Sequence, residues 1–152
     1  MILAIDVGNT HVVLGSIENG ECASLARLAT DPQKTDSEYA VLMRDVLGLC
    51  GKTLEELEGC IISSVVPPVT VLLQGAYRIL CGKEAVVVGA GIKTGLDIRI
   101  DDPATLGADL VVGAVGALAL TEAPLIVIDM GTATTLFAVG PKNTFLGGAI
   151  MP

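Results

Sequence analysis

The chain has 152 residues, of which 51% are hydrophobic and 17% are charged, and its formal net charge at pH 7 is −8. This composition excludes a disordered chain and predicts a globular protein with a substantial core. The acidic balance, without any cluster of Lys or Arg, argues against nucleic acid as a partner. No apolar run approaches the ~20 residues that a membrane-spanning helix needs, and the N-terminus lacks the basic segment of a signal peptide.

The four cysteines favour a cytoplasmic location. Cys22, Cys50, Cys60 and Cys81 show neither the C-x-x-C spacing of a metal site nor a partner cluster of histidines. We therefore expect reduced, mostly buried thiols, as in a cytosolic protein.

The first part of the chain predicts strands joined by tight turns. Apolar runs at 2–7 and 11–17 are typical of strands, and Asn19-Gly20 is a strong signal for a hairpin turn into a third strand at about 23–28. Three antiparallel strands followed by alternating helices and strands indicate a mixed α/β fold.

Helices and strands alternate in the next part. Thr35 and Glu38 have the spacing of a helix capping box, and apolar residues recur at helical spacing behind them as far as Leu49. The further elements expected up to residue 120 are a strand at 61–66, a helix from Pro67 to about Leu80, a strand at 85–88, and a long helix that Asp102-Pro103 caps and that runs through Leu120.

After Pro124 the opening of the chain is repeated. Ile5-Asp6-Val7-Gly8-Asn9-Thr10 and Ile128-Asp129-Met130-Gly131-Thr132-Ala133 stand 123 positions apart, and 140–143 predicts the hairpin turn of the second copy. We expect a complete domain at 1–122 and the beginning of a second at 123–152, with 147–152 in a tight turn. A full second copy would need roughly 95 more residues, so the chain is either a fragment or one whose partner chain supplies the rest.

Each copy of this repeat suits a site for a metal-bound phosphate. An apolar strand ends in an Asp, and a glycine turn follows. Backbone N–H groups of such a turn can meet phosphate, and the carboxylate can hold a metal. A plain β-turn in which Asp and Asn satisfy their own backbone is the alternative for one copy. The recurrence favours two turns that grip a nucleotide, which predicts a phosphotransferase.

Asp109 is the candidate general base. It stands in Gly107-Ala108-Asp109 at the start of an apolar helix, where a carboxylate is either a partner of the helix dipole or a proton acceptor. Beside a phosphoryl-transfer site, the second role is favoured. His11 is a lone histidine in a strand, which we interpret as a packing or polar contact.

Two glycine-containing segments are interpreted as structural. Residues 48–53 end like a phosphate-binding P-loop but lack its first glycine and follow a helix, so we expect a helix C-cap and a turn. Residues 89–91 lack the third glycine of a dinucleotide fingerprint.

These residues resemble the type III pantothenate kinases, of the acetate and sugar kinase/Hsp70/actin superfamily. The motifs that carry the resemblance are 6–10, 63–67, 91–96, 107–109, 129–134 and 147–150. The resemblance implies an actin-like (ribonuclease H-like) α/β domain with a mixed sheet, followed by the opening strands of a second copy. It also implies ATP-dependent phosphorylation of pantothenate to 4'-phosphopantothenate, the first step towards coenzyme A.

The resemblance further implies a role for each site residue and a homodimer. ATP phosphates would lie against Asp6, Val7, Gly8, Asn9, Thr10, His11, Val12 and Val13, with Thr132 on the second phosphate loop. Asp109 would accept the proton of the pantothenate hydroxyl, and Asp129 would bind a monovalent cation, K⁺ or NH₄⁺, in addition to the Mg²⁺ of the nucleotide. Pantothenate would lie against Gly107, Ala108, Asp109, Leu110 and Ile100.

Two positions depart from the family pattern, which has Arg at the position of Leu110 and Tyr at the position of Ile100. A charge-assisted hydrogen bond is worth ~1.5–3 kcal/mol, so loss of the Arg alone would weaken pantothenate binding roughly 10- to 150-fold. Two alternatives therefore stay open. Beside the pantothenate kinase that the resemblance implies, the first is a non-catalytic nucleotide-binding or regulatory relative that has lost pantothenate recognition. The second is an enzyme of this superfamily that acts on a less polar hydroxyl substrate.

Overall fold

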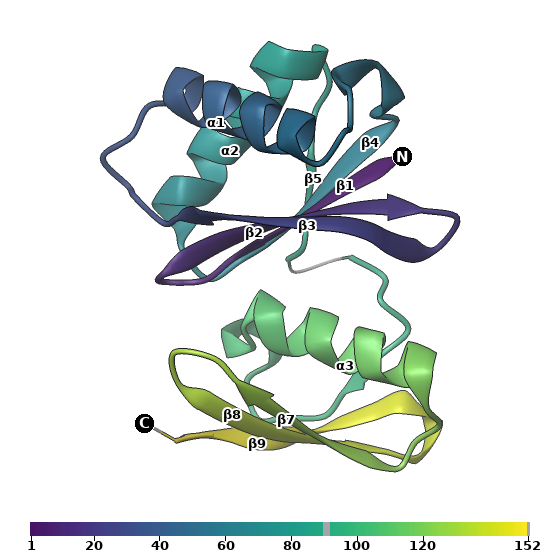
Figure 1. Ribbon diagram of the computed structural model, residues 1–152. Helices are drawn as coiled ribbons and strands as arrows, with labels where there is room; N and C mark the ends of the chain where they lie inside the picture. The colour runs from purple at the N-terminus through teal and green to yellow at the C-terminus, as the bar shows by residue number, and fades with distance from the viewer. Residues whose placement is uncertain (90–91, 152) are drawn as a thin grey trace. The chain divides into compact units, whose positions relative to one another are not determined.

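The computed structural model describes residues 1–89 and 92–151 (Figure 1). The chain divides into two compact units, Met1–Val88 and Gly89–Pro152. The domains expected at 1–122 and 123–152 stay a prediction. Within the described ranges, none of the helices combines the length and the apolar composition needed to cross a bilayer.

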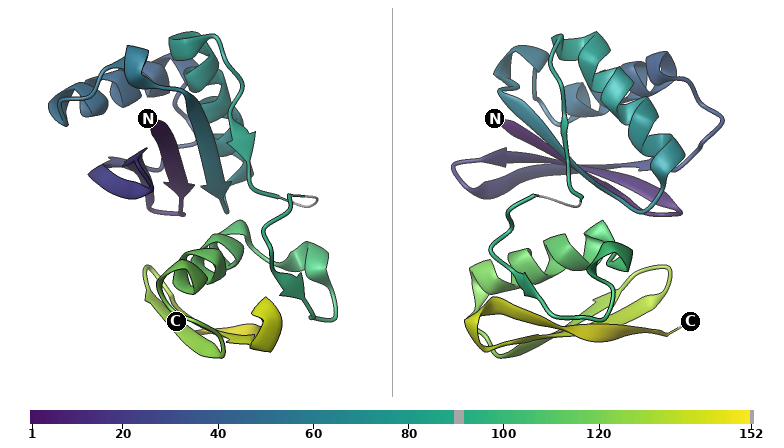
Figure 2. Two further views of the ribbon diagram at one scale, coloured as in Figure 1. Left: turned by 90° about the vertical axis from the view of Figure 1, so that its right-hand side faces the viewer. Right: turned by 180° about the vertical axis from the view of Figure 1, so that it is seen from behind.

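The first unit is a mixed sheet with two helices on one face (Figures 1 and 2). Its strands are β1 (Ile2–Val7), β2 (His11–Glu18), β3 (Glu21–Ala29), β4 (Gly59–Ser64) and β5 (Val86–Val87), in the order β3-β2-β1-β4-β5. Its helices are α1 (Asp36–Leu49) and α2 (Pro67–Cys81), with a short 3₁₀ turn η1 (Leu54–Glu56) between α1 and β4. The pairs β1–β2 and β2–β3 are antiparallel, whereas β1–β4 and β4–β5 are parallel, as the mixed sheet predicted from the sequence requires.

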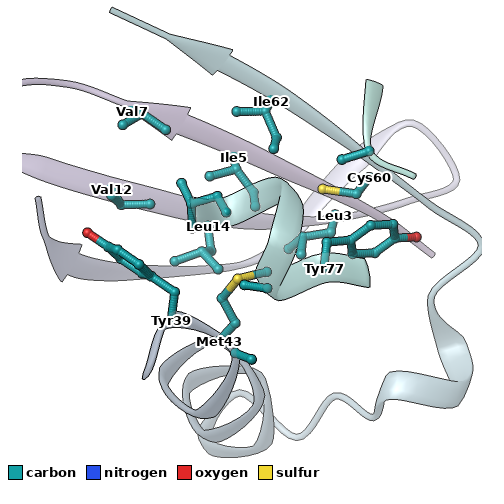
Figure 3. Packing of buried hydrophobic residues seen from close by; sticks show 14 of the residues in the cluster. Leu3, Ile5, Val7, Val12, Leu14, Tyr39, Met43, Cys60, Ile62 and Tyr77 are labelled. Atoms are coloured by element: carbon teal, nitrogen blue, oxygen red, sulfur yellow. The ribbon is translucent and has the colours of Figure 1, made fainter. Parts of the chain in front are cut away.

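The core of this unit lies between the sheet and the two helices. Leu3, Ile5 and Val7 alternate along β1 and are fully buried on the face that the helices cover. Figure 3 shows them in one cluster with Tyr39 of α1 and Tyr77 of α2. Each such aliphatic side chain contributes about 1.5–3 kcal/mol on burial. This contribution fixes which face of β1 turns inward, so that Asp6 lies on the opposite face.

Both helix starts expected here are confirmed. The Glu38 backbone N–H donates to Thr35 Oγ1 (3.2 Å), and the Thr35 backbone N–H donates to Glu38 Oε2 (2.7 Å), which completes the capping box of α1. Pro67 is the first residue of α2. Residues 48–53 form the end of α1 and a turn, with Gly51 in the left-handed region at φ 70°.

Three expectations about this unit need correction. β4 ends at Ser64, two residues early, because the Ser64 hydroxyl accepts a hydrogen bond from the Val66 backbone and starts the turn into α2. The strand expected at 85–88 is reduced to two residues. The cysteines are not mostly buried: Cys22 is exposed on the edge strand β3, and Cys60 alone of the four is buried. Burial raises the pKa of the Cys60 thiol to about 12.

The second unit is a smaller sheet with one helix on one face (Figure 2). Its strands are β6 (Asp97–Ile98), β7 (Leu125–Met130), β8 (Thr134–Gly140) and β9 (Thr144–Met151), in the order β6-β9-β8-β7. The other elements are α3 (Ala108–Leu120) and the 3₁₀ turns η2 (Pro103–Thr105) and η3 (Pro141–Asn143). Its core joins Ala114 of α3 to Phe137, Val139 and Phe145 of the sheet, and the two phenylalanine rings stack with centroids 5.6 Å apart.

Two expectations about the second unit were wrong. Asp102-Pro103 opens only the separate turn η2, and α3 begins at Ala108 because Gly107 is extended, with φ −60° and ψ 144°. Residues 147–151 continue β9 instead of forming a tight turn, since Gly148 lets the strand approach Phe137 closely. The hairpin turn expected at 140–143 is confirmed as η3. Ala90 and Gly91, which belong to two sequence motifs, lie outside the described residues.

The two buried tyrosines give a matched test of the first core. The Tyr39 hydroxyl donates to the Asp31 carbonyl (3.1 Å) and accepts from the Asp31 N–H (2.9 Å), whereas the Tyr77 hydroxyl is buried without a partner among the described residues. We expect Tyr39→Phe to lower the free energy of unfolding by about 1–2 kcal/mol and Tyr77→Phe to leave it unchanged or raise it. Urea denaturation measures both, and a larger loss for Tyr77→Phe would contradict this account.

Substitution by alanine at two glycines of the second unit should change its stability in opposite directions. A Cβ on Gly148 would lie 2.6 Å from the Leu136 carbonyl oxygen, whereas a Cβ on Gly116 in α3 would meet nothing within 4 Å. We expect Gly148→Ala to destabilise the second unit by about 1–3 kcal/mol through overpacking. Gly116→Ala should stabilise it by up to about 1 kcal/mol through helix propensity. Amide exchange in β8 reports both, and equal effects would refute the close approach of β9 to β8.

Candidate functional site

Asp6 lies where two parallel strands end. It is the second-last residue of β1 and pairs with Val13 on β2 and with Ser63 on β4. The turn that follows is closed by the Gly8 backbone N–H, which donates to the His11 carbonyl (3.0 Å). The His11 side chain is exposed, so its backbone is the part that shapes the turn. The structure thus brings residues 6–13 together at one tip of the first sheet.

Thr30 holds this turn from the end of β3. Its hydroxyl donates to the Gly8 carbonyl (2.7 Å), and its backbone N–H donates to the Thr10 carbonyl (3.0 Å). No sequence motif marks Thr30, because its role depends on the register between β2 and β3. Thr30 therefore belongs to the site although sequence reasoning missed it.

A second group of hydroxyls lies at the end of β4. The Thr70 hydroxyl donates to Ser64 Oγ (2.7 Å), and the Val66 N–H donates to the same oxygen (3.0 Å). Ser63 is 7% exposed, and its Oγ has no hydrogen-bond partner among the described residues. Because Ser63 pairs with Asp6 in parallel register, its hydroxyl and that carboxylate lie on the same face of the sheet.

Asp129 repeats the position of Asp6 in the second unit. It is the second-last residue of β7, and the turn after it is closed by the Gly131 N–H, which donates to the Ala133 carbonyl (3.2 Å). Thr132 lies in this turn and is exposed. The repeat seen in the sequence is therefore a repeat of structure, with an exposed carboxylate at each strand end.

The two turns differ in one respect. Val7 pairs with Val12, whereas Met130 pairs with Thr134, so the second turn encloses one residue fewer. The backbone N–H groups of the two turns are for this reason not arranged identically.

Each hairpin offers one carboxylate as a hard oxygen ligand. Asp6 and Asp129 are both exposed and stand beside glycine turns with little side-chain bulk. Mg²⁺ bound with a nucleotide takes one or two carboxylates from a protein and fills its other positions with phosphate oxygens and water. The donor set of these hairpins fits an ion of this kind.

Asp109 lies in the first turn of α3, two residues after the N-cap Gly107. A Cβ on Gly107 would collide with Asp109 Oδ1, so the carboxylate folds back over the glycine. The Val111 N–H donates to the Gly107 carbonyl (3.3 Å) and closes this first helical turn. Gly107 is therefore needed for the observed orientation of the Asp109 side chain, and Asp109 is exposed to solvent.

Ile100 and Leu110 are brought together in one pocket of about 450 Å³ in the second unit. Leu106 and Phe145 also line it, together with the polar residues Arg99, Asp101 and Thr105, so its wall combines apolar and polar groups. Gly107, Ala108 and Asp109 do not line this pocket, although sequence reasoning grouped them with Leu110.

The bond from Thr30 to the first turn gives a direct test. Thr30→Val removes one hydroxyl hydrogen bond, worth about 1 kcal/mol, so we expect local opening at Gly8 to rise about fivefold. Amide hydrogen exchange of residues 8–10 measures this effect. Thr144→Val is the matched control, because the Thr144 hydroxyl also donates to a carbonyl, that of Pro141 (2.9 Å), in the other unit. Equal exchange at Gly8 in both variants would contradict the role of Thr30.

Comparison with solved structures identifies the fold. A structure described as an N-acetylglucosamine kinase of Porphyromonas gingivalis superposes with a TM-score of 0.53 at 16% identity, over 98% of this chain and 47% of that chain. At this identity the likeness concerns the fold alone. Together with the mixed sheet, it confirms the actin-like α/β class expected from the sequence.

Comparison with known sequences identifies the family. The family model of type III pantothenate kinases matches residues 2–152. The type III pantothenate kinases of Moorella thermoacetica and Syntrophotalea carbinolica are 43% and 44% identical over 152 residues, and both matches cover 100% of this chain and 60% of the relative. The chain thus spans about three fifths of the length of these relatives. It belongs to the type III pantothenate kinase family.

Proposed function

We propose that this chain carries the phosphate-binding and hydroxyl-activating groups of an enzyme that phosphorylates pantothenate with ATP. The product would be 4'-phosphopantothenate, and the reaction would open coenzyme A biosynthesis. The observation that carries the proposal is the repeated strand–turn pattern, in which Asp6 and Asp129 each precede a glycine turn. Membership of the family adds independent support.

The phosphates of ATP are assigned to the two hairpins. Residues 6–13 offer backbone N–H groups and the Asp6 carboxylate. Thr132 lies in the corresponding turn of the second copy. Mg²⁺, when bound, would neutralise charge on the phosphate oxygens. Asp129 is the candidate ligand of a monovalent cation, K⁺ or NH₄⁺. An exposed carboxylate beside a turn of small residues supports both assignments.

Asp109 is assigned as the general base. The pantothenate hydroxyl oxygen would form a bond to the γ-phosphorus, the bond from that phosphorus to the β–γ bridging oxygen would break, and ADP would leave. The hydroxyl proton would pass to the Asp109 carboxylate. Its exposure and its position beside Gly107 support this role. Pantothenate would lie along Gly107, Ala108, Leu110 and Ile100.

The remaining assignments concern the whole protein. We propose a cytoplasmic homodimer whose partners are ATP and pantothenate, without nucleic acid or membrane. The net charge of −8 supports the exclusion of nucleic acid.

A second candidate is a nucleotide-binding relative that no longer phosphorylates pantothenate. The observation that favours it is that Ile100 and Leu110 contribute only aliphatic side chains to the pocket, with no group that could bind a carboxylate substrate.

Release of ADP by this chain in the presence of pantothenate, Mg²⁺ and K⁺ separates the two candidates. We expect pantothenate-dependent turnover that falls about 100-fold or more in Asp109→Asn, because a general base contributes 10²–10⁴-fold. Asp45→Asn is the control, since Asp45 forms a surface ion pair with Arg44 on α1. Absence of turnover from a folded chain that binds ATP would contradict the kinase proposal and favour the binding relative.

A further inference from the structure

Ser63 places a buried hydroxyl beside the first hairpin turn. The residue is 7% exposed, and its Oγ has no hydrogen-bond partner among the described residues. The Tyr77 hydroxyl shares this property but belongs to the apolar core of the first unit. A buried polar group without a partner costs free energy. A catalytic role and a contact with an ion or a water molecule are among the common reasons for the presence of such a group.

The neighbour of Ser63 on the next strand is Asp6. The two residues are paired directly between the parallel strands β1 and β4, so their side chains leave the same face of the sheet. Paired strands lie about 4.8 Å apart, and a hydrogen bond between two oxygens needs about 2.5–3.0 Å. A change in the rotamer of the serine can therefore bring its hydroxyl onto the carboxylate.

The two serines at the end of β4 differ in what their hydroxyls already bind. Ser64 lies on the opposite face of the strand, where its Oγ accepts from the Thr70 hydroxyl (2.7 Å) and from the Val66 N–H (3.0 Å). These bonds commit Ser64 to the turn into α2. Of the two hydroxyls, that of Ser63 is the one on the side of Asp6, and it is not committed to any group among the described residues.

We propose that Ser63 is a positioning residue, whose hydroxyl donates to the Asp6 carboxylate when that carboxylate holds the divalent cation of a bound nucleotide. This inference rests on the proposed function, because that function places the nucleotide and its Mg²⁺ at Asp6. A carboxylate that binds a metal ion is itself commonly hydrogen-bonded, and this second partner orients it. The cost of the unpaired hydroxyl in the free chain is thereby removed on binding.

Binding of ATP with and without the metal tests this role. Titration calorimetry gives the affinity of the chain for ATP in Mg²⁺ and in excess EDTA. We expect Ser63→Ala to weaken binding in Mg²⁺ about 10-fold or more, since loss of such a partner typically costs 10- to 100-fold in metal affinity. Binding in EDTA should be unchanged, because the hydroxyl acts through the metal ligand. Ser63→Thr keeps a hydroxyl and should retain the affinity in Mg²⁺.

Ser16→Ala is the matched control. Ser16 is 1% exposed on β2, its Oγ is hydrogen-bonded with Ser24 Oγ (2.6 Å), and it pairs with Leu3 instead of Asp6 on β1. We expect Ser16→Ala to lower the midpoint of urea denaturation and to leave the affinity for ATP in Mg²⁺ unchanged. Ser63→Ala should do the reverse, because it removes a hydroxyl that is unpaired in the free chain. A merely structural role of Ser63 would instead lower the midpoint.

Three results would overturn the inference: equal affinities of Ser63→Ala and the unaltered chain for ATP in Mg²⁺, a loss that is as large in EDTA, or no binding of ATP in Mg²⁺ by the unaltered chain. ADP release in the presence of pantothenate separates this inference from the kinase proposal. Pantothenate-dependent turnover together with normal binding by Ser63→Ala would refute the inference alone. A loss specific to Mg²⁺ without any pantothenate-dependent turnover would refute the kinase proposal alone.

Discussion

Burial of one face of β1 is the constraint on which the first site depends. Leu3, Ile5 and Val7 alternate under α1 and α2, and this alternation leaves Asp6 on the other face at the end of the strand. A shift of register by one residue would exchange the faces and bury the carboxylate in the core. Burial of that carboxylate in the core would cost more free energy than the hydrogen bonds of the turn contribute. The position of Asp6 is thus a consequence of the packing of its neighbours on the opposite face of β1.

The same sequence pattern meets a different environment in the second unit. The face of β7 that carries Leu125, Val127 and Asp129 is the one that packs beside α3, while Ile126 and Ile128 are exposed. In the first unit the opposite face is covered, since Leu3 and Ile5, which correspond to Ile126 and Ile128, are buried. The strand and its turn are therefore set locally, whereas the covered face depends on which helices the unit contains.

Local signals made much of this fold predictable, and long-range pairings account for what was missed. The capping box at Thr35 and the repeated strand–turn pattern are read within a few residues, so the sequence reveals them. The helix α3 begins after Gly107, where the apolar run of the sequence begins, and not at Asp102-Pro103, because the backbone at Gly107 is extended. Thr30 and Ser63 join the site only through strand register, and Ile100 meets Leu110 only through packing. Each of these needed the folded chain.

β7 also has a consequence for how this chain behaves in solution. It lies at the end of the order β6-β9-β8-β7, and β8 is its one strand partner among the described residues. Its outer face carries Ile126, Ile128 and Met130, all at least 60% exposed. A strand with an open backbone edge and an apolar face is a template on which a further strand can add. β7 is therefore one surface through which the chain can associate as its concentration rises.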